Sequence, residues 1–452
     1  MEITETLSDG LKREFQIQVP VADLEARVSA RLSELKERVQ LRGFRPGKVP
    51  VTHLKKIYGK AVMAETIEAV IRELNAQVVS DRGLKLAMEP KVTLPEEAGE
   101  IDKVIGGKSD LAYTLALEIL PKIELADFKG IKLERLTGEV TDDQVKEALE
   151  RLAEQNRPFS PKGEGAKIEK GDRAVIDFTG KIDGVPFEGG SGGDVGVNVG
   201  SGTFIPGFED QLVGMGMGEQ RVVKVTFPAN YTAAQLAGKA AEFDVTVKSI
   251  EAPGQVTLDD AFAKSLGLDS LDKIKEAIKA RLQQELAGLS RQKLKRQLLD
   301  KLDEMHKFAL PPTLAEDEFK NVWNAVEGDL KAQGRTFEDE GTTEEKAREE
   351  YRGIAERRVR LGLVLAEIGE KNNITVPDEE ITRAIVERAR QLPGREQEIW
   401  EYYRKNPAAV ASIRAPIFEE KVVDFLVELA KVTDKQVSRE ELLKEDEDEK
   451  TS

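Results

Sequence analysis

The turn at residues 43–50 carries an aromatic ring and two basic side chains on a support of glycine and proline. It reads Gly-Phe-Arg-Pro-Gly-Lys-Val-Pro. Glycine admits a positive φ, whereas proline fixes φ and removes a hydrogen-bond donor, so this composition predicts a tight turn that faces solvent. The turn itself offers Phe44, Arg45 and Lys48 no apolar neighbours that would bury them. A stiff loop that displays such side chains is suited to binding another molecule.

The charge around this turn favours a partner that carries phosphate. From Lys36 to Lys60 there are eight basic residues and one acid, Glu37, in a chain whose formal net charge is −16. This reversal predicts a basic tip on an acidic body. A nucleotide-binding loop is disfavoured, because one residue too few separates the two glycines and Val49 stands where a hydroxyl would reach magnesium. An ordinary structural turn remains the alternative.

A second set of residues could carry out a reaction that needs no nucleophile. Within residues 171–250, aromatic rings recur in an ordered series of short motifs. Rotating a peptide bond faces a barrier of about 18–20 kcal/mol, because the twisted amide loses resonance. The twisted amide is less charge-separated than the planar one, so a cavity lined by rings penalises it less. The alternative is that the rings are only core. The motifs are Asp177-Phe178-Thr179-Gly180, Phe187-Glu188-Gly189, Phe204-Ile205-Pro206-Gly207-Phe208-Glu209, Phe227-Pro228-Ala229-Asn230-Tyr231 and Phe243-Asp244-Val245.

Other kinds of catalytic site are disfavoured by composition. The chain has no cysteine, which excludes disulfides and thiolate chemistry, and only two histidines, His53 and His306. A structural zinc site or a Ser-His-Asp triad is therefore not expected, and we predict no metal and no cofactor. The glycines at 200–202 and 214–218 lack dinucleotide spacing and are better explained as turns between strands.

Hydrophobic periodicity predicts the elements that position these residues. Amphipathic helices flank the basic turn, strands alternate at residues 11–19 and 111–119, and Thr141 with Gln144 predicts a capping box. Residues 157–172 have the composition of a linker. Short strands with dense glycine occupy 171–250, and helical spacing prevails from Leu258 onward. Prolines at 311–312, 377, 393, 407 and 416 predict helix breaks or kinks.

The predicted fold class is multidomain α+β, with a small α+β domain, an antiparallel sheet domain and an extended all-helical C-terminal domain. We place the domains at 1–112, 168–252 and 253–434, with a connecting segment and linker at 113–167. The acidic tail at 435–452 is expected to be disordered. The N-terminus lacks the pattern of a secretory signal, and no window approaches the roughly 18 apolar residues of a membrane span. These features predict a soluble, cytoplasmic protein.

The basic turn resembles the ribosome-docking signature of the trigger factor family. Gly43, Phe44, Arg45, Gly47 and Pro50 match that signature position by position. Position 46 often carries a further base in the family, whereas this chain has proline. The resemblance implies a ribosome-binding set of Gly43, Phe44, Arg45, Pro46, Gly47 and Lys48.

The aromatic series is similar to the FKBP-type peptidyl-prolyl isomerase domain, from one end of the module to the other. Phe208 stands where many members have tryptophan, and Val195 where the residue is usually aromatic. Ile205 would supply the backbone N–H that holds the substrate carbonyl. The resemblance implies a proline site formed by Phe178, Phe187, Glu188, Phe204, Ile205, Phe208, Tyr231 and Phe243.

Together these resemblances imply an ATP-independent chaperone that meets nascent chains at the ribosomal exit tunnel and isomerises X-Pro bonds. The implied partners are an exit-tunnel protein, ribosomal RNA and unfolded polypeptides, with no DNA and no membrane. A monomer–dimer equilibrium is also implied, and its position is not set by the sequence. One alternative is a free FKBP-type isomerase whose helical extensions serve dimerisation or folding, without a ribosome role. Another is an RNA-binding factor that acts through the basic loop.

Overall fold

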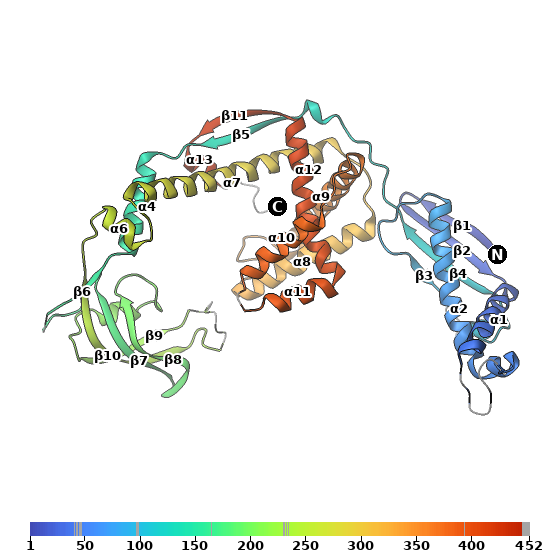
Figure 1. Ribbon diagram of the computed structural model, residues 1–452, viewed down its shortest axis with the longest axis horizontal. Helices are drawn as coiled ribbons and strands as arrows, with labels where there is room; N and C mark the ends of the chain where they lie inside the picture. The colour runs from blue at the N-terminus through green and yellow to red at the C-terminus, as the bar shows by residue number, and fades with distance from the viewer. Residues whose placement is uncertain are drawn as a thin grey trace.

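The computed structural model describes residues 1–39, 41, 44, 48–95, 99–163, 165–228, 231, 233, 235–392 and 394–444. These residues form an elongated arch in which the N-terminal unit lies at one end and a sheet module from the middle of the sequence lies at the other (Figure 1). The C-terminal helices lie between them. Within the described part of the chain, no helix has the length and apolar character to cross a membrane.

The N-terminal unit is an antiparallel sheet covered by two long helices. Its strand order is β1-β2-β4-β3, from β1 (Glu2–Asp9), β2 (Lys12–Val19), β3 (Lys91–Thr93) and β4 (Leu111–Glu118). Alternate residues of β2 and β4 are buried against α1 (Val21–Arg38) and α2 (Val51–Asp81), and α3 (Glu100–Ile105) closes one edge. The predicted strands and helices are confirmed. The domain boundary predicted at 112 is wrong, because it falls inside β4.

The sheet module is also antiparallel, in the order β6-β10-β7-β8 with β9 paired to β10. Its elements are β6 (Phe159–Pro161), β7 (Arg173–Ile182), β8 (Val185–Asn198), α5 (Phe208–Leu212), β9 (Gln220–Thr226) and β10 (Ala240–Pro253). Because β6 pairs with the end of β10, the module begins before the predicted boundary at 168. The Gly254 N–H donates to the Pro158 carbonyl at 2.8 Å, so chain entry and exit lie side by side.

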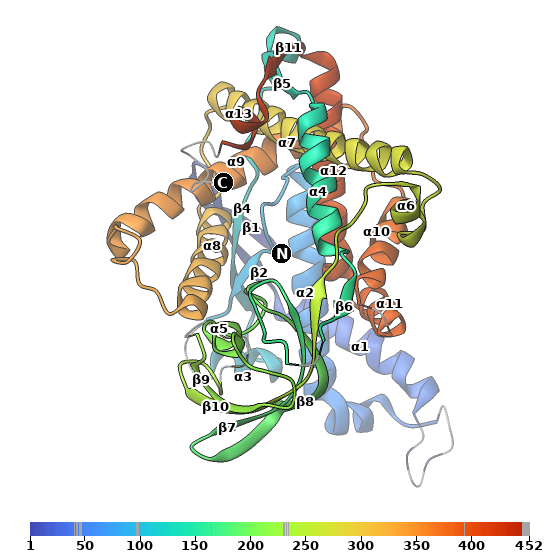
Figure 2. The same ribbon diagram turned by 90° about the vertical axis from the view of Figure 1, so that its left-hand side faces the viewer.

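The helical unit consists mainly of antiparallel helix pairs. Its helices are α6 (Asp260–Ser265), α7 (Leu271–Met305), α8 (Pro312–Gln333), α9 (Glu344–Lys371), α10 (Asp378–Arg390), α11 (Glu396–Lys405) and α12 (Pro407–Leu429). The α8–α9 pair and the α10–α11 pair extend on opposite sides as two arms (Figure 2). Prolines 312, 377 and 407 lie at helix starts as predicted, whereas Pro416 lies inside α12, and Pro393 is outside the described residues.

The connecting segment is not a simple linker. Ile123, Phe128, Ile131 and Leu133 are buried in one core with residues of α7, α9 and α12. The 3-10 helix Phe128–Gly130 leads into β5 (Lys132–Gly138), and α4 (Asp142–Gln155) begins with the predicted capping box, in which Thr141 and Gln144 bond reciprocally. The helical unit is therefore built from two parts of the chain, one before and one after the sheet module in the sequence.

The end of the chain differs from the sequence prediction. β11 (Lys431–Val437) pairs in parallel with β5, which adds a strand to the helical unit, and α13 (Arg439–Leu443) follows it. The side chain of Leu442 is 1% exposed. The prediction of a disordered tail is therefore wrong for residues 435–444, and residues 445–452 lie outside the described part.

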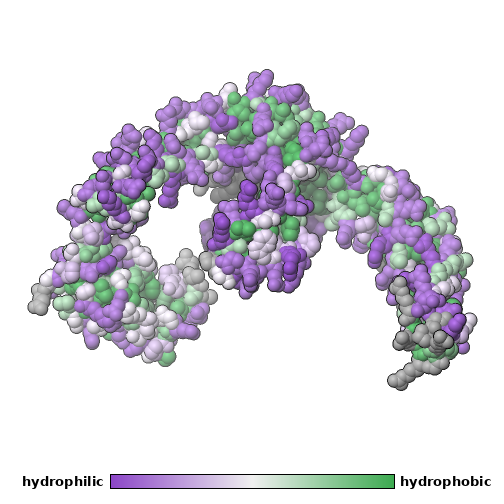
Figure 3. All heavy atoms as spheres, viewed as in Figure 1, coloured by the Kyte–Doolittle hydropathy of each residue, from purple (hydrophilic) through white to green (hydrophobic). Residues whose placement is uncertain are grey.

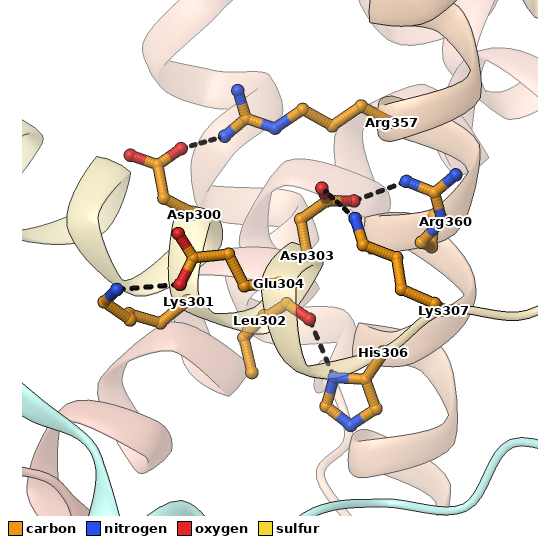
Figure 4. Close-up of polar contacts among 9 residues, drawn as sticks. All are labelled: Asp300, Lys301, Leu302, Asp303, Glu304, His306, Lys307, Arg357 and Arg360. Atoms are coloured by element: carbon orange, nitrogen blue, oxygen red, sulfur yellow. Dashed lines mark hydrogen bonds and ion pairs between the residues drawn. The ribbon is translucent and has the colours of Figure 1, made fainter.

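Polar contacts fasten α7 to α9 and to the connecting segment near the base of the arms (Figure 4). Arg357 and Arg360 of α9 pair with Asp300 and Asp303 of α7. His306 is 3% exposed, and its Nδ1 lies 2.8 Å from the Leu302 carbonyl. Its Nε2 accepts the Ala126 N–H at 3.3 Å, so the two contacts together select the neutral ring with the proton on Nδ1. His306 thus ties the connecting segment to the end of α7.

We expect a chain ending at Ala430 to lose stability in its helical unit, whereas a chain ending at Lys444 keeps it. The shorter chain lacks β11 and the buried Leu442, and loss of one buried leucine alone costs about 2–5 kcal/mol. Denaturant unfolding of both chains, followed by circular dichroism, measures the difference. Equal stability of the two truncated chains would contradict the role assigned to β11 and α13.

Candidate functional site

A cluster of phenylalanine rings lies between the sheet and α5 of the module. Phe243 of β10 is its centre, with ring centroids 5.4 Å from Phe208, 6.0 Å from Phe178, 6.1 Å from Phe187 and 6.5 Å from Phe227. Most of these pairs meet edge to face, the arrangement that the charge distribution of aromatic rings favours. Phe208 and Phe243 are 2% and 5% exposed, so they form a floor.

Half-buried side chains surround this floor. The Phe204 ring stacks on Phe208 at 5.4 Å, and Ile205 follows it in the chain. Tyr231 is exposed at the rim, with its ring 4.7 Å from Phe227. Val195 also packs against the core, as expected for a wall residue. The arrangement, called the aromatic depression below, has buried rings at its centre and half-buried or exposed residues at its edge.

The structure brings together the predicted site residues with one exception. Phe178, Phe187, Phe204, Ile205, Phe208 and Phe243 belong to the core or pack against it, and Tyr231 joins through Phe227. Glu188 is exposed on β8 beside Phe187, and no hydrogen bond or ion pair among the described residues ties it to the rings.

Phe227 was missed as a site residue by the sequence analysis, although its motif was recognised. It is 2% exposed and lies between Phe187, Phe243 and Tyr231. Its position directly before Pro228 at the end of β9 was the available signal. Phe227 supports the rim residue Tyr231 and so belongs to the depression.

Glycines let the rings lie against the strands. A Cβ atom at Gly180 would be 2.6 Å from the Phe243 ring and 2.8 Å from the Phe187 ring, and one at Gly190 would be 2.7 Å from Phe187. Because real Cβ atoms essentially never come that close to other heavy atoms, any larger residue would displace the rings. The sequence analysis interpreted only the glycines at 200–202 and 214–218, as turns, and gave no role to Gly180 and Gly190, which make space for the rings.

A buried carboxylate holds the loop that carries Phe204 and Ile205. Glu209 is 6% exposed, and its two oxygens accept hydrogen bonds from the N–H groups of Gly200 (2.8 Å), Gly202 (3.0 Å) and Phe204 (3.1 Å). The Ser201 hydroxyl donates a further bond at 3.2 Å. Burial raises the pKa of Glu209, but these donors outweigh burial and the net pKa lies below its usual range. The sequence analysis quoted Glu209 in a motif without assigning it this role.

The Ile205 N–H is a backbone donor of this loop that has no assigned partner among the described residues. The Ile205 carbonyl accepts the Phe208 N–H at 2.9 Å, which begins α5. Among the hydrogen bonds of the described residues, none uses the Ile205 N–H. Ile205 directly follows Phe204, whose ring stacks on Phe208.

The basic turn is described only in part. Gly43, Arg45, Pro46 and Gly47 lie outside the described residues. Phe44 is 38% exposed, and its ring lies 5.2 Å from that of His53 in the first turn of α2, a neighbour that the sequence analysis did not foresee. Lys48 is exposed, whereas Val49 is fully buried and anchors the chain where α2 begins. The turn joins the ends of α1 and α2 that lie farthest from the helical unit (Figure 1).

Replacing Glu209 with Gln is expected to destabilise the sheet module at neutral pH by about 1–3 kcal/mol. The amide presents an N–H₂ group to backbone donors that need an acceptor. Because the folded-state pKa of Glu209 is depressed, its stabilisation is present above the usual carboxyl pKa and is lost as pH falls through the folded value. The stability difference between the two proteins should therefore shrink from pH 6 to pH 3 in urea unfolding. Glu188→Gln is the control, and an equal effect there would contradict the assignment.

Models of known protein families match a segment of the chain in each of the three units. Residues 1–152 match a family model described as bacterial trigger factor protein, and residues 270–428 match that of its C-terminus. Residues 164–248 match the FKBP-type peptidyl-prolyl cis-trans isomerase. These matches confirm both resemblances predicted from the sequence.

Relatives align over nearly the entire chain. Trigger factor of Afipia carboxidovorans is 59% identical over 448 residues, which cover 99% of both chains. That of Rhodopseudomonas palustris is 58% identical over 452 residues, covering 100% of both. A solved structure from a study of promiscuous substrate recognition by the trigger factor chaperone shares the fold, with a TM-score of 0.57 and 21% identity over 95% of this chain and 99% of that one. The chain thus belongs to the trigger factor family, and it is a chaperone with an FKBP-type peptidyl-prolyl isomerase domain.

Proposed function

We propose that X-Pro bonds are isomerised in the depression over Phe208 and Phe243, with Phe178, Phe187, Phe204, Ile205 and Tyr231 around the proline. The observation that carries this proposal is the group of rings around Phe243, in which Phe208 and Phe243 are buried and Tyr231 at the edge is exposed. We add Phe227 to the set as support for Tyr231. Glu188 is kept as a residue of the site's edge, since its carboxylate is exposed.

The geometry suits a reaction without proton transfer. The proline ring would lie on the phenylalanine floor, while the Ile205 N–H donates to the carbonyl oxygen of a neighbouring peptide unit and fixes the substrate. Excluding water from the X-Pro amide favours the twisted, less polar transition state over the planar amide. Each tenfold acceleration requires about 1.36 kcal/mol of this difference. Glu209 acts indirectly, because it positions the loop that carries the Ile205 N–H.

The ribosome-binding site is proposed at the basic turn, residues 43–48. The exposed Phe44 and Lys48 support this proposal, since they are displayed at the far end of the N-terminal unit. The partner surface would be an exit-tunnel protein and the phosphates of ribosomal RNA, which attract the bases around the turn. We accordingly place the protein in the cytoplasm, partly bound to ribosomes, and expect free molecules in a monomer–dimer equilibrium.

Nascent segments would be held by the helical arms without nucleotide hydrolysis. An open space separates the sheet module from the arms, and apolar residues are interspersed with hydrophilic ones over the helical unit (Figure 3). On the α10–α11 arm, Leu392, Trp400 and Tyr402 are 49%, 40% and 56% exposed. Separate exposed apolar side chains of this kind suit weak binding of many different sequences.

For these functions we divide the chain at residues given by the structure. Residues 1–118 form the ribosome-binding domain and 159–253 the isomerase domain. Residues 119–158 and 254–444 together form the chaperone domain. The hydrogen bond between Gly254 and Pro158 supports treating the isomerase domain as an insertion that leaves the chaperone domain continuous.

Changing Phe208 to Ala should lower kcat/KM for a short X-Pro peptide at least tenfold. The substitution removes a ring from the floor and lets water reach the amide, and it also destabilises the domain by about 3–5 kcal/mol. A melting curve must accompany the assay. Phe159→Ala, which removes a half-buried ring of β6 in the same domain, is the matched control and should retain activity. Full activity in a folded Phe208→Ala protein would place the site elsewhere.

Replacing Phe44, Arg45 and Lys48 together with Ala should weaken co-sedimentation with ribosomes at least tenfold. These side chains belong to a turn, so their loss removes little core volume. The matched control replaces Tyr402, Arg404 and Lys405 of α11, which are likewise an aromatic and two bases on an exposed surface. Binding of the unchanged protein should fall with added salt, because bases that neutralise phosphates release counterions. Normal ribosome binding by the first variant, or an equal loss in the second, would refute the docking site and favour a free isomerase.

A further inference from the structure

The helix that carries the floor ring Phe208 is too short to be stable by itself. α5 has five residues, whereas isolated helices shorter than about 12–15 residues are marginal in water. Its inner side is held by the burial of Phe208 and Leu212. Burial alone does not fix how the helix is placed over an apolar core, because the hydrophobic effect is not directional. The exact position of Phe208 therefore depends on hydrogen bonds that α5 makes with its neighbours.

The side-chain amide of Gln211 makes such hydrogen bonds with the strand β9. Its Nε2 donates to the Lys224 carbonyl at 2.8 Å, and its Oε1 accepts the Lys224 N–H at 3.2 Å. Nε2 also donates to the Gly207 carbonyl at 2.8 Å, which it can do because it carries two hydrogens. The amide therefore pairs with Lys224 as a neighbouring strand would, and both of its donors and its acceptor are used.

Arg221 of the same strand adds a charged contact at the end of α5. Its Nη1 donates to the Gln211 carbonyl at 2.7 Å. The last carbonyls of a helix have no partner within the helix and carry partial negative charge, so a guanidinium stabilises them. The Nη2 atom of Arg221 pairs with Glu219 at 3.0 Å. Because β9 is paired in turn with β10, which carries Phe243, these contacts connect α5 to the strand of the central ring.

We propose that Gln211 is a positioning residue of the isomerase reaction, because its amide holds α5 at a fixed place along β9. α5 carries Phe208 and Glu209, and Glu209 holds the loop that contains Ile205. A shift of α5 along β9 would move both the floor ring and the Ile205 N–H relative to Phe243. Misplacement by about 1 Å can cost a hundredfold in rate. This inference rests on the proposed proline site over Phe208 and Phe243.

The substitution Gln211→Glu keeps the shape of the side chain and makes its hydrogen bonds depend on pH. An ionised carboxylate only accepts, so it cannot donate to the carbonyls of Gly207 and Lys224. A protonated carboxyl has one O–H that can donate to the Lys224 carbonyl, while its other oxygen accepts the Lys224 N–H. The facing carbonyl oxygens disfavour the charged form and so raise the pKa of the introduced carboxyl above the usual value of about 4.3. The bases of β9 beside this position are paired with acids.

We expect kcat/KM of the Gln211→Glu protein for a short X-Pro peptide to be about tenfold below that of the unchanged protein at pH 7.5. At pH 5 the difference should shrink to about threefold, because one of the two lost donors is restored. Exchange between the cis and trans NMR signals of the peptide measures the rate without a coupled protease. Circular dichroism gives the folded fraction, and each rate is divided by it, so that a loss of stability alone leaves the result unchanged.

Two controls show whether the pH dependence belongs to this contact. The unchanged protein should be equally active at pH 7.5 and pH 5, since the reaction transfers no proton. Gln220→Glu makes the same substitution at an exposed residue of β9 whose side chain has no hydrogen bond among the described residues, and it should keep full activity at both pH values. Gln211→Ala has no group that titrates and should be impaired at both.

A second readout separates the role of Gln211 from the location of the proline site. In the full chain labelled with ¹⁵N in isoleucine and phenylalanine, the backbone signals of Ile205 and Phe208 should shift in Gln211→Glu at pH 7.5 and return toward their original positions at pH 5. Unshifted signals, or an activity loss that does not recover at pH 5, would overturn the inference. If the signals shift while activity is unchanged, the activity of Phe208→Ala decides. An inactive Phe208→Ala protein then overturns the role of Gln211, whereas an active one refutes the proposed site.

Discussion

The architecture depends on one core that the chain builds from two distant segments. Ile123, Phe128, Ile131 and Leu133 are buried against α7, α9 and α12, and β5 pairs with β11 some three hundred residues later. Burial of these side chains fixes the connecting segment on the helical unit. The connecting segment in turn sets the points at which the N-terminal unit and the isomerase domain are attached, at opposite ends of the arch (Figure 1).

This arrangement keeps the functional surfaces apart. The ends of α1 and α2 that flank the basic turn lie in one unit, the aromatic cluster around Phe243 lies in another, and the arms lie between them (Figure 1). The isomerase domain is joined to the helical unit at Pro158 and Gly254, which lie side by side, so it can be present without interrupting the helical core.

Isomerisation of an X-Pro bond is a simple reaction, but the rings and the loop around Phe243 still have to be positioned for it. No titrating group is required, yet Gly180 and Gly190 must lack side chains so that the rings meet around Phe243. Glu209 must be ionised and buried so that its loop presents Phe204 and Ile205 correctly.

The sequence by itself determined the periodic elements, the two signatures and the class of reaction. These depend on local features: the spacing of apolar residues, the capping box at Thr141, and motifs that keep a fixed order along the chain. Tertiary structure alone decided which distant segments share a core, and for this reason the boundary at 112, the linker and the disorder of residues 435–444 were predicted wrongly. It also decided that Phe227 and Glu209 belong with the site and that Glu188 faces solvent. The shared cores join residues far apart in sequence, and local periodicity carries no information about such contacts. The donors to Glu209 are near in sequence, but the folded loop that aims them at one carboxylate leaves no periodic pattern.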